Sequence, residues 1–314
     1  MTNKKAKPKH FVLLRLMKQK YQHKIVRDLE WCISSPELLN ETLAFGEDMI
    51  MDYFLEFKEK LTKLDKDPLE LETFLSHKNT LRLGHYYEAL ICFWLQNSRK
   101  FDLLANNIPL RNQEKITIGE VDLIVFNKIT KDHEHWELAV KFYLAHIKKG
   151  KTDYIGPNAN DYFHLKLAKL KNSQCKILET VPGKKYLSEL NISEIKNKLL
   201  VKGLLCYHPK DIKKPWENIS VQHAQSWWIY WEEAQEFLDD ALSYSMLDKK
   251  EWLSTPSLPR QQCNKKEFLN IIHLEFSHSQ SSLFIVGYKK NTLKTKGFVV
   301  HTHWPNLYNK KATP

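Results

Sequence analysis

The sequence has few of the residues that mark several common classes of protein. Its five cysteines are scattered and form no Cys-x-x-Cys pair, which argues against a disulfide framework and a structural zinc site. Glycine is scarce, with nine residues, and no glycine-rich loop for phosphate is present. The apolar run FVLLRLM is short and contains Arg15, and no run approaches the roughly 18 apolar residues of a spanning helix. We therefore expect a cytoplasmic protein with no membrane-inserted segment.

Arginine is also rare, with six residues, although the chain carries a net charge of +11. The positive charge is concentrated in residues 1–28, with nine basic and one acidic residue, and in residues 141–214, with sixteen lysines and six acids. Two basic zones of this kind could attract nucleic acid. A codon bias toward lysine explains the same charge, and arginine is the residue expected for bidentate phosphate contacts. Charge alone therefore favours a nucleic-acid partner only slightly.

The hydrophobic spacing predicts an α/β protein with a mixed sheet. Ser35 is a candidate N-cap for a helix over 35–64, and Asp67 and Pro68 begin another helix. Residues 80–98 predict an amphipathic helix, and residues 156–175 predict a later one capped by Asn160 or Asp161. Strands are expected over 101–112, 115–128, 135–144 and 203–207, with a strand pair over 282–290 and 296–304. The aromatic segment 226–242 is expected to be helical, so its tryptophans belong to a core or interface.

Charged residues interrupt two of the expected strands, two residues apart in the first strand and four apart in the second. Glu120 and Asp122 share one face of the strand over 115–128, and Glu137 and Lys141 share one face of the strand over 135–144. Facing side chains on adjacent antiparallel strands lie about 5 Å apart. Carboxylates gathered in this way repel one another unless a cation lies among them, and oxygen ligands suit Mg²⁺ or Mn²⁺. The alternative is an edge strand whose wet face carries an ion pair.

Histidines offer a second candidate site that is weaker. His133 and His135 flank a charged segment that contains Asp132 and Glu134. A zinc pair is conceivable there, but a solvated turn is the favoured interpretation.

The spaced GEVD and ELAVK segments and the element order resemble the PD-(D/E)XK nuclease superfamily. More closely, the chain resembles an uncharacterised bacterial family of unknown function assigned to that superfamily. The matching segments run from the N-terminal helices into the last third of the chain: VRDLEWCISSPELL, LGHYYEAL, GEVDLIVF, HWELAVKFYL, YIGPNANDYFHLKLAKL, QHAQSWW and EWLSTP. The resemblance implies a restriction-endonuclease-like core made of a helix, a three-stranded meander, a helix and a further strand. It places this core over residues 80–215, between an N-terminal helical segment over 1–79 and a C-terminal α+β extension over 216–314.

The resemblance also implies roles for individual residues. Asp122 matches the metal-binding aspartate, and Glu137 and Lys141 fall on the strand that carries the superfamily signature. Glu88 resembles an additional acidic ligand, and Glu120 is a neighbour that assists. The usual signature leaves one residue between carboxylate and lysine, but Ala139 occupies the expected carboxylate position here. The same strand face is kept, with the carboxylate about 6–7 Å further back along the strand.

Three functions follow from this pattern. The first is a Mg²⁺- or Mn²⁺-dependent nuclease that hydrolyses phosphodiester bonds in DNA or RNA, with Lys166 and Lys169 contacting backbone phosphates. The second is a catalytically degenerate nucleic-acid-binding protein of the same fold. The third is an interaction scaffold in which the acids and the lysine form only a buried ion network. The expected catalytic residues are Asp122, Glu137 and Lys141, and the expected metal ligands are Asp122, Glu137, Glu88 and Glu120.

Overall fold

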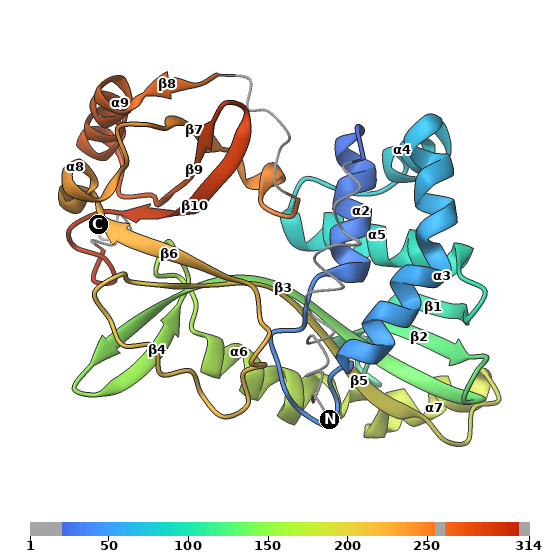
Figure 1. Cartoon of the computed structure of the whole chain (residues 1–314). Coiled ribbons are helices and arrows are strands. Elements are labelled where there is room, and N and C mark those ends of the chain that lie inside the picture. Colours follow the sequence, from blue (N-terminus) through green and yellow to red (C-terminus); the bar gives the residue numbers. More distant parts are fainter. Residues whose placement is uncertain (1–20, 255–260, 308–314) are drawn as a thin grey trace, which may run out of the picture.

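The computed structural model describes residues 21–254 and 261–307, and the run FVLLRLM lies outside them. A ten-stranded mixed sheet runs through this part of the chain in the order β1-β2-β3-β5-β6-β10-β9-β7-β8, with β4 paired to β3 (Figure 1). Its strands are β1 (Phe101–Arg111), β2 (Thr117–Asn127), β3 (Asp132–Lys148), β4 (Lys151–Ile155), β5 (Lys196–Tyr207), β6 (Gln225–Tyr230), β7 (Ser243–Leu247), β8 (Cys263–Asn264), β9 (Leu283–Lys289) and β10 (Thr292–Val300).

The helices lie on both faces of this sheet. They are α2 (Lys24–Ser34), α3 (Glu47–Lys66), α4 (Leu69–Ser76), α5 (Leu83–Asn97), α6 (Phe163–Lys169), α7 (Val181–Glu189), α8 (Ala234–Phe237) and α9 (Lys265–His278). In Figure 1 the helices α2–α5 lie above β3, and α6 and α7 lie beneath it. Trp136 and Leu138 of β3 pack in the core under α2–α5, whereas Ala139 and Tyr143 pack with Phe163 of α6. The period of two therefore gives β3 two buried faces.

The arrangement around β3 follows the expected order of elements, except that the strand β4, which was not predicted, lies between β3 and α6 in the sequence. After α5, the strands β1, β2 and β3 form an antiparallel meander, and β5 pairs parallel to β3 after α6 and α7. That this core is restriction-endonuclease-like stays a prediction. The interpretation of residues 135–144 as an edge strand with a wet face is wrong for the wet face, because Glu137 is buried. Residues 137–143 pair with β5 alone, since the pairing with β2 ends at Trp136 and that with β4 begins at Leu144.

Residues beyond 216 continue the same sheet. Strands β5, β6 and β10 are parallel neighbours, and β10, β9, β7 and β8 follow as antiparallel strands. The expected strand pair is confirmed as β9 and β10. The expected helix over 226–242 is wrong at its start, because residues 225–230 form β6 with Trp228 buried. Large aromatic residues suit a half-buried strand, and this preference outweighed the helical spacing.

Two expected helix caps are also wrong. Ser35 ends α2 instead of beginning a helix, and α3 starts only at Glu47. Helix α6 begins after Tyr162 without a side-chain cap. The carboxylate of Asp161 forms an ion pair with Lys141 instead, with 2.7 Å between Oδ2 and Nζ.

Candidate functional site

Strands β2 and β3 place the two predicted central carboxylates next to each other. The pairing of these strands runs from Asn127 and Asp132 to Leu123 and Trp136. At the next position Asp122 Oδ2 accepts a hydrogen bond from the backbone N–H of Leu138 at 2.8 Å. The carboxylate of Asp122 therefore replaces a backbone acceptor where the two strands separate.

Asp122 lies in surroundings that disfavour its negative charge. Burial, together with the nearby charges of Glu137 and Glu88, raises the pKa of Asp122 to about 8. The N–H of Leu138 and the ammonium of Lys166 act in the opposite direction without offsetting the rise. Near neutral pH this carboxyl group therefore takes up either a proton or a cation.

Glu137 is completely buried, and both of its oxygens have partners. His135 Nε2 lies 2.9 Å from Oε1, and Gln174 Nε2 donates to Oε2 at 2.7 Å. His135 Nδ1 lies 2.9 Å from Asn197 Oδ1. Both ring nitrogens of His135 thus have a side-chain partner.

The histidines do not lie in the solvated turn that was expected. His133 and His135 both belong to β3, and His135 is fully buried. The roles of His135 and of Gln174 were missed in the sequence. Alternation along the strand could have placed His135 on the face of Glu137, whereas Gln174 follows α6 and carries no local signal.

Two lysines from different elements lie near each other, and of these Lys166 acts on the charges of Asp122 and Glu137. Lys141 of β3 is held by Asp161, which also accepts a hydrogen bond from Tyr143 Oη at 3.2 Å. Lys166 of α6 donates to Gln174 Oε1 at 3.0 Å, so the amide of Gln174 connects Lys166 with Glu137. Burial lowers the pKa of Lys166, as does the ammonium of Lys141, while Asp122 and Glu137 favour its charged form.

Lys166 therefore lies within the group of charges, although it was predicted to contact the nucleic-acid backbone. Lys169, which was predicted to share that contact, is exposed on the same helix. Its role stays a prediction.

The two additional acids lie at the margin of the group. Asn107 Nδ2 donates to Glu88 Oε2 at 3.3 Å and to Glu120 Oε1 at 3.2 Å, so it connects the two side chains. Burial raises the pKa of Glu88. Glu120 is exposed, and it acts on the group through Glu88.

A cleft of about 600 Å³ opens onto these residues. Glu88, Lys141, Asp161 and Lys166 line it, together with residues 81–84, 249, 250 and 252. Asp122 and Glu137 are not among the residues that line the cleft. A second cavity of about 770 Å³ adjoins the cleft, because Leu83 and Lys250 line both.

A metal site at these residues would have few protein ligands. Mg²⁺ is commonly held by one or two carboxylates and keeps several of its waters. Asp122 uses only Oδ2 in its hydrogen bond to the backbone, and the crowded negative charge at Asp122 and Glu137 favours a cation. In residues 21–254 and 261–307, no group of three or more His, Cys, Asp or Glu side chains is placed to hold an ion.

These features define an α/β protein whose mixed sheet carries a half-buried and a fully buried carboxylate, with two lysines that line a cleft. The chain belongs to the family Domain of unknown function (DUF1853), whose profile matches residues 27–300. No curated protein and no solved structure matches it. Among the described helices, none combines the length and apolar character needed to cross a bilayer.

Proposed function

We propose that this protein is a Mg²⁺- or Mn²⁺-dependent phosphodiesterase that acts on DNA or RNA, built on a restriction-endonuclease-like core. The observation that carries the proposal is the environment of Asp122, a carboxyl group that burial and a second carboxylate make unfavourable as a free anion. A divalent cation would relieve that repulsion. The order α5, β1–β3, α6–α7 and β5 supports the same proposal, because it matches the order that the resemblance implies.

Each residue of the site would have a separate role in binding the metal or in the reaction. Asp122 and Glu137 would hold the metal, and Glu88, with Glu120 behind it, would add negative charge at its outer side. The bound metal would supply a more acidic water and stabilise charge on the phosphate. Lys141, whose ammonium is fixed by Asp161, would orient the attacking water or stabilise the transition state. Burial of the carboxylates would strengthen each of these interactions.

One observation favours the second candidate, a nucleic-acid-binding protein that does not cut. Both oxygens of Glu137 already accept hydrogen bonds, from His135 and Gln174. Glu137 would have to give up one of these partners to bind a metal directly. In the binding protein the same contacts would be permanent, and the lysines would serve only to attract phosphate.

A cleavage assay separates these candidates. We expect the wild type to cut DNA or RNA oligonucleotides only when Mg²⁺ or Mn²⁺ is added. The substitution Asp122→Asn should abolish cleavage, and Lys141→Ala should reduce it about 10²- to 10³-fold, the usual cost of losing one electrostatic contact to a transition state. The matched control is Asp102→Asn, which makes the same change at an exposed residue of β1.

The control variant should cut at the wild-type rate. Cleavage by Asp122→Asn, or cleavage that persists in a metal chelator, would contradict the proposed site. Metal-independent binding of both nucleic acids with no cleavage would favour the binding protein.

A further inference from the structure

One wall of the cleft comes from a part of the chain far from the predicted core. Residues 248–252, which contain the short helix η4 (Lys249–Glu251), place Lys249, Lys250 and Trp252 on the cleft. Arg82, which precedes α5, lines the same cleft. The cleft is thus bordered by cations from two separate segments in addition to Lys141 and Lys166.

The charges in the cleft do not balance. Five cationic side chains line it, at 82, 141, 166, 249 and 250, but only two acidic ones, at 88 and 161. Lys141 is neutralised by Asp161. Within the described part of the chain, Arg82, Lys249 and Lys250 form no ion pair with a carboxylate, and all three are exposed. The excess positive charge therefore lies at the mouth of the cleft and is accessible from solvent.

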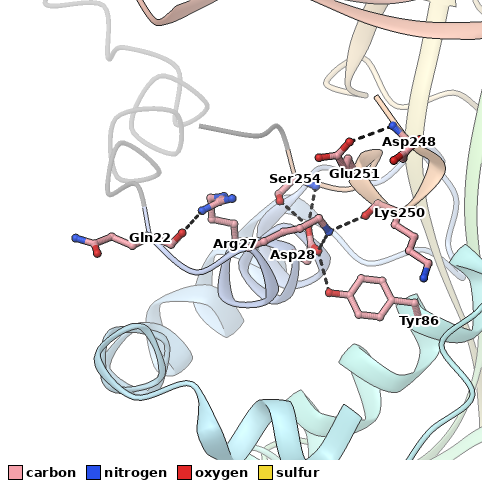
Figure 2. A network of polar contacts seen from close by, with 9 residues as sticks. Gln22, Arg27, Asp28, Tyr86, Asp248, Lys250, Glu251 and Ser254 are labelled. Atoms are coloured by element: carbon pink, nitrogen blue, oxygen red, sulfur yellow. Dashed lines mark hydrogen bonds and ion pairs between the residues drawn. The ribbon is translucent and has the colours of Figure 1, made fainter. Parts of the chain in front are cut away.

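A buried carboxylate on α2 holds this wall in place. Asp28 is completely buried, and its Oδ1 accepts hydrogen bonds from Ser254 N at 3.1 Å and from Ser254 Oγ at 2.5 Å (Figure 2). Its Oδ2 accepts from Tyr86 Oη at 2.9 Å and from Lys24 Nζ at 2.5 Å. Lys24 Nζ also donates to the backbone oxygen of Lys250 at 2.6 Å.

Contacts within residues 248–252 also stabilise the helix η4. Asp248 N–H donates to Glu251 Oε2 at 3.0 Å, and Asp248 and Glu251 form a capping box. Lys249 Nζ lies 5.7 Å from the centre of the Trp252 ring. The backbone that carries Lys249 and Lys250 is thus fixed to α2 and α5, while their ammonium groups stay in solvent.

We propose that Lys249, Lys250 and Arg82 form a preorganised wall that binds the backbone phosphates of the nucleic acid cut in this cleft, and that Asp28 positions it. This inference rests on the proposed function. Fixed cations without protein partners can exchange their counterions for phosphates, which is the main source of affinity for nucleic acid. Because the wall lines the same cleft as Lys141 and Glu88, a strand bound to it would pass these predicted site residues.

The test measures binding by fluorescence anisotropy of labelled DNA and RNA oligonucleotides in a metal chelator, from 0.05 to 0.4 M KCl. Losing two phosphate contacts should reduce the slope of log K against log salt by about 1.8 for a duplex and about 1.4 for a single strand. If the affinities converge at 1 M salt, the double variant Lys249→Ala/Lys250→Ala should bind a duplex roughly thirtyfold more weakly at 0.15 M. The matched control is Lys184→Ala/Lys185→Ala, which removes two exposed charges from α7.

The control pair should keep the wild-type slope. An unchanged slope in the 249/250 variant, with a wild type that binds and cuts, would overturn the wall and leave the proposed function standing. An equal decrease of the salt slope in the 249/250 and 184/185 variants would indicate non-specific attraction by the surface charge, and it would also overturn the wall. A wild type that neither binds nor cuts would overturn the wall and the proposed function together.

A second comparison tests the role of Asp28. If Asp28 acts through the wall, Asp28→Asn should lower the salt slope in a chain that retains both lysines. Adding Asp28→Asn to the 249/250 variant should then change the slope no further. A salt slope equal to that of the wild type in Asp28→Asn would show that the buried carboxylate does not position these lysines.

Discussion

Replacing Asp122 with asparagine removes a charge at nearly constant shape, and its effect on stability follows from the surroundings of this residue. The pKa of Asp122 is about 8 in the folded protein, against an ordinary value of 3.8. The folded state therefore keeps a proton that the unfolded chain releases, so stability falls as pH rises from about 4 to about 8. The free energy of unfolding at pH 7 is therefore about 4 kcal/mol lower than at pH 4, because each pH unit contributes about 1.36 kcal/mol.

Asparagine has no proton to release, and its side-chain oxygen can still accept the hydrogen bond from the N–H of Leu138. We therefore expect Asp122→Asn to be more stable than the wild type at pH 7 to 8, by up to about 4 kcal/mol. The gain should shrink toward zero as the pH is lowered to about 4. Urea denaturation at several pH values, without metal, measures it.

Divalent metal supplies the second half of this test. Mn²⁺ at one hundred times its dissociation constant should stabilise the wild type by about 2.7 kcal/mol and should not stabilise Asp122→Asn. The alternative of a structural ion network predicts the reverse, because removing one member of a buried pair destabilises by about 3–5 kcal/mol. A destabilised variant together with a wild type indifferent to Mn²⁺ would refute the reasoning.

Two further predictions concern β5 beneath the site. The Nζ of Lys202 is fully buried and lies 3.3 Å from Oε1 of Glu37, whose pKa is raised to about 7 by burial. We therefore expect Lys202→Met to lower the free energy of unfolding, measured in urea, by about 3–5 kcal/mol. Adding Glu37→Gln should recover part of this loss, because it removes the carboxylate that was left without a partner. If the double variant is no more stable than Lys202→Met, the pairing of Lys202 with Glu37 is contradicted. Gly203 has a φ of +149°, and a Cβ at this position would lie 1.6 Å from the backbone oxygen of Lys141. Gly203→Ala should therefore push β3 and β5 apart and lower the melting temperature sharply. A variant that melts like the wild type would show that these strands tolerate a wider spacing.

Much of the meander could be predicted because its signals are local. The alternation in 115–128 and 135–144 identified β2 and β3 and placed Asp122 and Glu137 on matching faces. Partners such as Gln174 and Asp161 could not be predicted, because they reach the carboxylates and Lys141 only through the packing of α6 against β3. The wall depends on Ser254 meeting Asp28, and no periodicity encodes a contact between residues so far apart.

That long separation also sets a time scale for synthesis. Asp28 and Ser254 are 226 residues apart, and at about 5–20 residues per second a ribosome needs roughly 10 to 45 s to make the intervening chain. Until then the carboxylate of Asp28 lacks two of its four donors, which disfavours its burial. The N-terminal helical layer should therefore reach its final packing only after residue 254 has left the exit tunnel. A nascent chain of this protein would have no finished cleft during most of its translation, when it lies closest to ribosomal RNA.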